Sequence, residues 1–155
     1  MSNVKFSQNR PLPLACGDDR FCGGRVHITT VRYVLPPKFH GRFDVYEKPG
    51  TKDQITDGVL TVRISKNGVG TVSSFKLLEE FISYEVYDEE NSLIQKNIGL
   101  DSKNDKVHSF GTLGVALTGP GGTTTQSSED ALYVGSRKEF LALPESSRQY
   151  RPFPR

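Results

Sequence analysis

The 155-residue sequence contains no tryptophan, one methionine and two cysteines. Two cysteines cannot supply the several disulfides on which small secreted scaffolds depend. No apolar stretch approaches the roughly 18 residues of a membrane-spanning helix, and the beginning of the sequence lacks the apolar run of a secretory signal. We therefore expect a soluble, cytoplasmic protein that is not secreted and has no transmembrane segment. Any contact with a membrane would be peripheral.

Hydrophobic residues are also scarce, at 35% of the sequence, whereas glycine and proline number 15 and 9. A chain of this length is the size of one domain and can bury about two-thirds of the surface that its unfolded form exposes. Its apolar content is not low enough to predict full disorder. The composition indicates one moderate core with long loops or extended ends.

Short segments rich in β-branched and aromatic residues recur along the sequence, with turn residues between them. The clearest is residues 58–65, in which Leu60, Val62 and Ile64 alternate with polar residues. This pattern predicts a mostly β fold, an antiparallel β-sandwich or barrel of seven to eight short strands. The predicted strands are residues 25–35, 42–47, 58–65, 82–87, 93–100, 106–118, 131–136 and 139–143.

One or two short helices are expected to interrupt these strands. Residues 73–81 are the best candidate, because Ser73 or Ser74 can cap a helix whose apolar residues share one face. Residues 119–130, rich in glycine, threonine and serine, are predicted to form a long polar loop.

The two ends of the sequence show no periodicity; residues 1–24 contain several prolines and glycines, and residues 144–155 contain several prolines. We predict an N-terminal arm over residues 1–24, a β-sandwich domain over residues 25–143 and a C-terminal arm over residues 144–155. Residues 146–155 are expected to be extended and not helical.

Charge is distributed unevenly, although the net charge is only +2. Residues 1–25 contain four basic and two acidic side chains, and residues 137–155 contain five and two, so the part between them is acidic. Basic ends on an acidic body suit contact with an anionic partner or with the acidic face of another copy. The alternative is that such charges are ordinary for flexible tails.

An acidic cluster, Asp88-Glu89-Glu90, follows a predicted strand and raises three alternatives: a calcium site, a catalytic carboxylate pair or a polar turn. Calcium needs six to eight oxygens from more than one loop. Asp53, Asp57, Asp101 and Asp105 could add ligands, but lysines lie beside them. Adjacent acids on an exposed turn have nothing to raise a pKa for catalysis. We interpret the cluster as a turn.

The two cysteines, Cys16 and Cys22, could bind zinc together with His27 and His40. Their five-residue separation exceeds the usual spacing of zinc ligands, and a disulfide is not expected to persist in the cytosol. Free thiols are the favoured interpretation.

Linear motifs of enzymes are absent from the sequence. The segment G-P-G-G-T-T-T at residues 119–125 lacks the lysine and the following helix of a phosphate-binding loop. The three histidines, His27, His40 and His108, are far apart in the chain. We predict that the protein is not an enzyme, has no cofactor, no metal and no small-molecule substrate; a site assembled from distant residues around Cys16, Cys22 and His27 is the alternative.

Arginines alternate with aromatic residues at the C-terminus, in the sequence R-Q-Y-R-P-F-P-R. Arginine can pair with phosphate and aromatic rings can stack on bases, and the same groups could bind a neighbouring subunit. We predict nucleic-acid or subunit contacts at Arg148, Tyr150, Arg151, Phe153, Arg155, Arg10, Arg20 and Arg25.

The segment K-L-L-E-E-F-I-S-Y-E-V-Y-D-E-E-N-S-L-I, residues 76–94, resembles matrix proteins of negative-strand RNA viruses, of the bornavirus and rhabdovirus type. The resemblance implies a small self-associating β-sandwich that coats the inside of an envelope and contacts nucleoprotein. The sequence departs from that family at Pro36-Pro37-Lys38-Phe39, which lacks the tyrosine of a Pro-Pro-x-Tyr motif. No functional residue is transferred from the family.

These observations together predict a non-enzymatic, self-assembling structural protein, a viral matrix or coat protein located in the cytoplasm or the virion. The expected partners are other copies of the chain in a homo-oligomer, nucleic acid or nucleoprotein, and a membrane surface. The alternative is a nucleic-acid-binding or adaptor β-domain that uses its basic arms.

Overall fold

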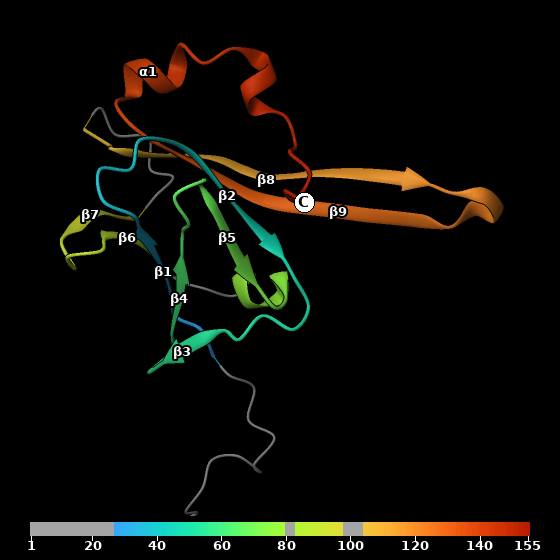
Figure 1. The fold of residues 1–155 in the computed structure, drawn as a ribbon, viewed down its shortest axis with the longest axis horizontal. Helices are drawn as coiled ribbons and strands as arrows, with labels where there is room; N and C mark the ends of the chain where they lie inside the picture. The colour runs from blue at the N-terminus through green and yellow to red at the C-terminus, as the bar shows by residue number, and fades with distance from the viewer. Residues whose placement is uncertain (1–26, 80–82, 98–103) are drawn as a thin grey trace, which may run out of the picture.

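The computed structural model describes residues 27–79, 83–97 and 104–155 (Figure 1). These residues form nine β-strands, one α-helix and three short 3-10 helices. The strands are β1 (Thr30–Leu35), β2 (Gly41–Glu47), β3 (Gln54–Thr56), β4 (Val59–Arg63), β5 (Val69–Val72), β6 (Ser83–Asp88), β7 (Leu93–Lys96), β8 (Val107–Thr118) and β9 (Thr124–Val134). The helices are η1 (Phe75–Leu78), η2 (Pro120–Gly122), α1 (Arg137–Leu141) and η3 (Glu145–Arg148).

The strands form two sheets, with the orders β3-β4-β1-β6-β7 and β5-β2-β9-β8. The predicted mostly β fold is confirmed. The prediction of purely antiparallel sheets with seven to eight strands is wrong in detail, because β1 pairs in parallel with both β4 and β6, and β2 pairs in parallel with β5. Both sheets are therefore mixed. Consecutive strands often enter different sheets, which produces these parallel neighbours.

The core lies between the two sheets and takes one face from each. β1 contributes Val31 and Tyr33, while β2 contributes Phe43 and Val45, and all four side chains are fully buried. The rings of Tyr33 and Phe43 meet edge to face, with their centroids 5.4 Å apart. Gly70 permits close packing here, because a β-carbon would come within 2.7 Å of Ile64 Cδ1. In both strands, alternate apolar residues thus face the core, as expected for side chains that point to opposite faces of a strand.

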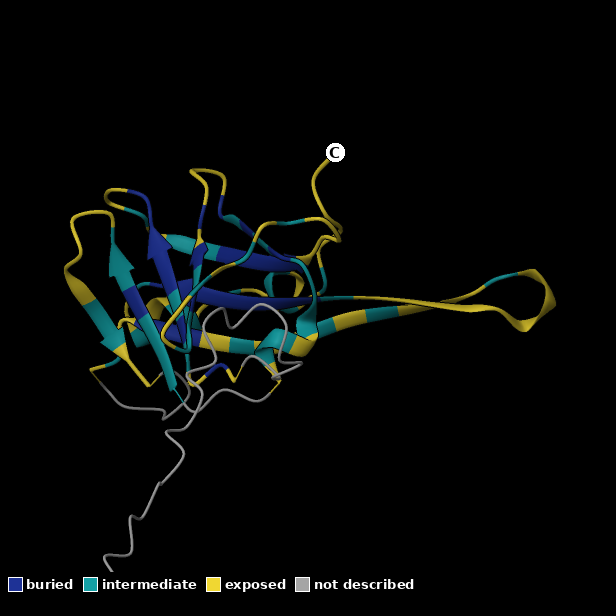
Figure 2. Cartoon of the chain, turned by 90° about the horizontal axis from the view of Figure 1, so that it is seen from below, coloured by how far each residue is buried: buried dark blue, intermediate teal, exposed yellow. Residues whose placement is uncertain are grey.

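β8 and β9 form a long hairpin that extends well beyond the rest of the molecule (Figures 1 and 2). We call its outer part, residues 112–128, the ribbon. The prediction of a polar loop over residues 119–130 is wrong, because β9 already begins at Thr124 and only five residues separate the strands. Threonine favours β-structure, and Gly121 and Gly122 adopt positive φ angles of 79° and 78° that suit the tight tip.

The helices differ from those expected. Within the described residues 73–79 of the predicted helix, the structure has only the short 3-10 helix η1, whose capping residue is Ser74. The predicted strand at residues 139–143 is wrong, because α1 occupies this position. Ser136 and Glu139 form a reciprocal capping box that fixes the start of α1. The ring of Phe140 then stacks on His108 with their centroids 4.8 Å apart, which attaches α1 to the sheet.

The predicted C-terminal arm lies against the body of its own chain. Its first part is the 3-10 helix η3, so the expectation that residues 146–155 contain no helix is wrong for residues 146–148. The remaining residues are extended and cross β2 and β9 on the face opposite the core. Pro144 stands directly before η3, where a proline is compatible with a helical start. The predicted N-terminal arm, residues 1–24, lies outside the described residues.

Candidate functional site

Strand β9 is longer than its neighbour β2, and this leaves part of its edge open. β8 pairs with β9 along residues 124–134, apart from one bulge, whereas β2 pairs only with residues 129–134. β2 ends at Glu47, and Pro49-Gly50 then redirects the chain. On its other side the pairing with β5 continues to Lys48, whose backbone N–H donates to the Val72 carbonyl at 2.8 Å. On the β2 side, residues 124–128 have no strand partner within the described parts of the chain. We call these residues the free edge.

A groove with a volume of about 470 Å³ lies beside the free edge. Its walls come from β2, from η1 with the residues around it, and from the C-terminal arm, while residues 126–128 provide one side. The groove therefore continues the row that β2 leaves vacant. The lining residues are Tyr46, Glu47, Ser74, Phe75, Lys76, Glu79, Gln126, Ser127, Ser128, Tyr150 and Phe153.

The wall at η1 is held by two carboxylates from other elements. Asp53 accepts hydrogen bonds from the backbone N–H and the hydroxyl of Ser73, the former at 2.9 Å. Glu47, at the end of β2, accepts the backbone N–H of Phe75 at 2.7 Å. These bonds satisfy donors that the short helix cannot satisfy itself. Both carboxylates therefore fix the start of η1, which carries Phe75 into the groove.

The opposite wall is held by aromatic contacts of the C-terminal arm. The ring of Phe153 meets Tyr46 edge to face at a centroid distance of 5.3 Å. The ammonium of Lys48 lies 5.5 Å from the centre of the same ring. An edge-to-face aromatic pair and a cation above a ring each contribute about 0.5–1.5 kcal/mol. The groove thus has an aromatic residue on each wall, Phe75 and Phe153.

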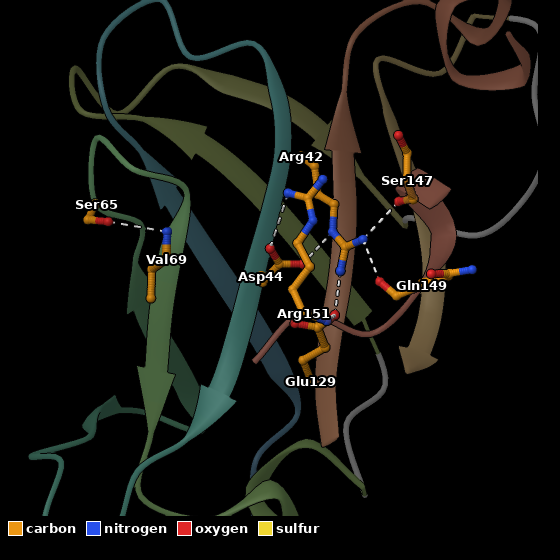
Figure 3. Close-up of polar contacts among 8 residues, drawn as sticks. All are labelled: Arg42, Asp44, Ser65, Val69, Glu129, Ser147, Gln149 and Arg151. Atoms are coloured by element: carbon orange, nitrogen blue, oxygen red, sulfur yellow. Dashed lines mark hydrogen bonds and ion pairs between the residues drawn. The ribbon is translucent and has the colours of Figure 1, made fainter. Parts of the chain in front are cut away.

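A buried ion cluster anchors the C-terminal arm to sheet β5-β2-β9-β8 (Figure 3). The guanidinium of Arg42, whose side chain is 5% exposed, donates to Asp44 at 2.6 Å and also to Glu129. Its third nitrogen donates to the carbonyls of Ser147 and Gln149, at 2.8 and 2.9 Å. Arg42 thus joins two carboxylates on neighbouring strands to the backbone of the arm.

The arm also satisfies Glu129 directly. The backbone N–H of Arg151 donates to Glu129 Oε1 at 2.8 Å. Burial raises the pKa of Glu129, although the nearby Tyr46 hydroxyl, the Arg151 N–H and the Arg42 charge oppose this effect. Burial likewise raises the pKa of Asp44 against the effect of Arg42. Removing Arg42 would therefore leave two buried acids without their shared cation.

A second cavity of about 200 Å³ adjoins the groove, and the two share Phe75, Glu79 and Ser128. We call it the acidic pocket. Asp130 contributes to its lining and accepts hydrogen bonds at Oδ2 from the hydroxyls of Tyr33 and Tyr84, at 3.0 and 3.3 Å. Burial raises the pKa of Asp130, and the two tyrosine hydroxyls partly offset this. The remaining lining residues are Tyr84, Leu78 and Thr112.

Most of the predicted C-terminal contact residues lie against other parts of the same chain. Arg148 lies 5.3 Å from the ring centre of Phe140 and donates to its carbonyl at 3.4 Å. Tyr150 and Phe153 line the groove. The charged end of Arg151 is half exposed and lies 4.0 Å from Asp44. Arg155 is exposed at the end of the arm.

Several predicted residues cannot be compared with the structure. Arg10, Arg20 and Arg25 lie outside the described residues, as do Cys16 and Cys22. Nucleic-acid or subunit contact by these residues and by the C-terminal arm stays a prediction. Among the described residues no group of three or more potential metal ligands comes together.

The interpretation of Asp88-Glu89-Glu90 as a turn is confirmed. The cluster connects β6 to β7, and the Asp88 carboxylate accepts the backbone N–H groups of Glu90 and Ser92 at 3.0 and 2.8 Å. The histidines are separate: His27 precedes β1, His40 lies 3.4 Å from Glu139, and His108 contacts the Gly135 carbonyl at 3.1 Å.

The free edge and its groove were missed by sequence reasoning. The glycines before Thr124, Thr125 and Gln126 and the serines after them are typical of a loop. The available signal was the strand pattern of residues 106–118, which requires a pairing partner, followed by β-branched threonines directly after the glycines. The groove itself could not be inferred, since it depends on where β2 stops relative to β9.

Comparisons with known proteins give little. No family model and no curated protein matches the chain. A solved structure with some similarity is that of a "putative lipoprotein from Bacillus anthracis", with a TM-score of 0.43 and 18% identity, covering 81% of this chain and 82% of that one. At this level the similarity transfers neither fold nor function to this chain.

The prediction of a viral matrix or coat protein is wrong. The solved structure found is bacterial, and no match names a viral matrix protein. Use of the basic arms by a nucleic-acid-binding or adaptor domain stays a prediction. In the residues that the structure describes, no helix is long and apolar enough to cross a membrane. A cytoplasmic location and the absence of enzymatic activity stay predictions.

Proposed function

We propose that this protein is a polypeptide-binding module that accepts an extended segment of another protein along the free edge of β9. The observation that carries the proposal is the mismatch in length between β2 and β9, which leaves residues 124–128 without a neighbour on one side and places a groove there. An unpaired strand edge presents a row of backbone donors and acceptors that an extended peptide can satisfy.

The free edge lacks the features by which proteins prevent such pairing. Exposed edges are usually protected by charged side chains, prolines or bulges. Residues 111–128 contain no Asp, Glu, Lys, Arg or His, and their one proline is at the tip of the hairpin. The β8–β9 bulge lies at the base, near Phe110, and not in the ribbon. The edge is therefore competent to accept a strand.

The walls of the groove match the alternation of side chains in a strand. A segment of five residues spans about 17 Å, comparable to the free edge. Side chains on one face of it would approach Phe75 and Lys76, and those on the other would approach Tyr150 and Phe153. Backbone hydrogen bonds would supply general affinity, and these walls would select among side chains.

Peptide selection followed by alternate backbone methylation tests this proposal. Random dodecapeptides displayed on phage are selected on the full-length protein, and the affinity of synthetic binders is measured by calorimetry. Each binder is then made in two matched forms, N-methylated at odd or at even positions. Because alternate N–H groups face the edge, one form should lose at least about tenfold in affinity while the other binds normally.

Two protein variants locate the binding. Ser127→Lys introduces a charge at the free edge and should weaken binding by about tenfold. Thr118→Lys introduces the same charge on β8, outside the groove, and should leave binding unchanged. Equal sensitivity to both methylation patterns, no effect of Ser127→Lys, or no selected peptide would overturn the proposal. A concentration-dependent molar mass that Ser127→Lys abolishes would overturn it too, because a second copy of this chain would then fill the edge.

A further inference from the structure

The acidic pocket contains a buried carboxylate that no cation among the described residues accompanies. Asp130 is 7% exposed, and its hydrogen bonds in the described parts of the chain come from two neutral hydroxyls, those of Tyr33 and Tyr84. None of the described residues that line the pocket is lysine or arginine. Buried carboxylates are normally paired with a cation, because an unpaired charge is expensive to remove from water. Asp130 therefore retains the capacity to bind a cation.

The hydrogen bonds of Asp130 leave one oxygen for a ligand. Both tyrosine hydroxyls donate to Oδ2, and no described residue donates to Oδ1. A guanidinium binds a carboxylate best through two parallel hydrogen bonds to both oxygens. An ammonium is a compact point charge that needs only one acceptor oxygen. The available chemistry of Asp130 thus favours an ammonium over a guanidinium.

The remaining walls suit the side chain that would carry this ammonium. Phe75 and Leu78 provide apolar surface for an aliphatic stem. Glu79 is exposed and contributes a second carboxylate to the lining, while Thr112 and Ser128 add hydroxyl groups. Lysine has an apolar four-carbon stem and a terminal ammonium, and therefore matches this arrangement.

The position of the pocket connects it to the free edge. Ser128 and Asp130 are two residues apart on β9, so their side chains lie on the same face of the sheet. Ser128 lines the groove as well as the pocket. A strand paired with the free edge would direct alternate side chains to this face, and one of them would lie at the entrance to the pocket.

We infer that the acidic pocket binds a lysine side chain of the added polypeptide segment, with Asp130 as the acceptor of its ammonium. This inference rests on the proposed function. It assigns a specificity to the site: among extended segments, those with a lysine at one fixed position bind best.

Substitutions at that lysine test the inference. Peptides selected on the full-length protein should be enriched in lysine at one position. Replacing this lysine with norleucine, which keeps the stem and removes the charge, should weaken binding at least tenfold. Arginine should weaken it by a similar factor. In Asp130→Asn, which keeps the shape and an acceptor for the tyrosines, the lysine-to-norleucine ratio should fall close to one.

The methylation pattern distinguishes failure of this inference from failure of the proposed function. If one methylation form still abolishes binding but lysine is not enriched, or if the lysine-to-norleucine ratio persists in Asp130→Asn, strand addition stands and the lysine pocket is overturned. If neither methylation form has an effect, both fail. Glu79→Gln provides a control at the exposed part of the pocket and should reduce the ratio less than Asp130→Asn does.

Discussion

The two halves of strand β9 differ in almost every physical respect. Residues 129–134 are buried, and strands pair with them on both sides. Residues 124–127 are exposed and Ser128 is half-buried, and only β8 pairs with this half. Figure 2 shows the change along one continuous strand, from dark blue in the body to yellow in the ribbon. One half stabilises the fold, and the other half presents an edge.

This comparison explains how an edge can be both ordered and open. A two-stranded ribbon alone is marginally stable in water. Here it continues from a base that the core and the ion cluster hold in place, so its strands are aligned without a third partner. A site built this way needs little change in shape on binding, which lowers the entropy lost when a partner is added.

The largest expected effect breaks the ion cluster at the buried half. Arg42→Ala leaves Asp44 and Glu129 without their cation and also releases the C-terminal arm from two of its hydrogen bonds. We expect a loss of about 3–5 kcal/mol in the free energy of unfolding, measured by urea denaturation. Arg155→Ala, at the exposed end of the arm, should change it by less than about 0.5 kcal/mol. A small effect of Arg42→Ala would refute the anchoring role of the cluster.

Matched leucine substitutions compare the two halves of the hairpin directly. Leu132 is 1% exposed in the buried half of β9, whereas Leu117 is 64% exposed on the ribbon. Leu132→Ala should lower the free energy of unfolding by about 2–5 kcal/mol, because it creates a cavity in the core. Leu117→Ala should change it by less than about 0.5 kcal/mol. Similar losses for both variants would mean that the ribbon packs against something in solution.

Shortening the hairpin separates fold from function. Joining Gly114 to Ser128, which are cross-strand partners, through an Asn-Gly turn removes most of the ribbon and its free edge. We expect the free energy of unfolding to change by no more than about 1 kcal/mol, because the removed side chains make few buried contacts. Binding of the selected peptides should disappear. Retained binding would move the site away from the free edge.

The smallest expected effect concerns pH and the carboxylate of the acidic pocket. Burial raises the pKa of Asp130 above its ordinary value of 3.8, so the folded protein binds this proton more tightly than the unfolded chain does. The stability that this proton provides is present below pH 3.8 and is lost as the pH rises through the raised pKa. Asp130→Asn should therefore gain stability relative to the wild type as the pH rises from 3.8 towards neutrality.

The pKa of Glu85 is shifted in the opposite direction to that of Asp130. Partial burial raises its pKa, but the hydrogen bonds and charges of Arg32 and Lys96 together lower it below 4.5. Its contribution to stability is present above pH 4.5 and is lost as the pH falls. Glu85→Gln should thus lose stability relative to the wild type as the pH rises. Urea titrations of both variants between pH 3 and 7 would show the two slopes, and slopes of equal sign would contradict these assignments.

Sequence patterns predicted the elements that alternate clearly. Residues 42–47 lie in β2 and residues 58–65 contain β4, because both alternate apolar and polar residues between turn signals. The strand predicted over residues 106–118 contains β8. The sequence prediction was wrong at the start of β9, because a segment rich in glycine, threonine and serine is typical of a loop. The predicted strand at residues 139–143 was also wrong. The apolar residues there favoured a strand, but the capping box of Ser136 and Glu139 starts helix α1 instead.

The candidate site could not be predicted from the sequence for a different reason. Its free edge arises from a relation between two strands that are distant in the chain, and its walls come from η1 and the C-terminal arm. Alternation predicted a strand over residues 42–47, but it could not show that the Arg42 and Asp44 side chains, on the face opposite Phe43 and Val45, are also buried. Their burial results from the C-terminal arm, which folds back over β2 and accepts hydrogen bonds from Arg42.

Hydrogen exchange along β9, with and without a selected peptide, tests the central claim most directly. In the free protein, amides of residues 129–134 should be protected, and the amides of residues 124–128 that face the free edge should exchange rapidly. Addition of the peptide should protect these edge amides and leave the buried half unchanged. Edge amides that are already protected in the free protein, or that stay unprotected when the peptide is bound, would contradict strand addition at β9.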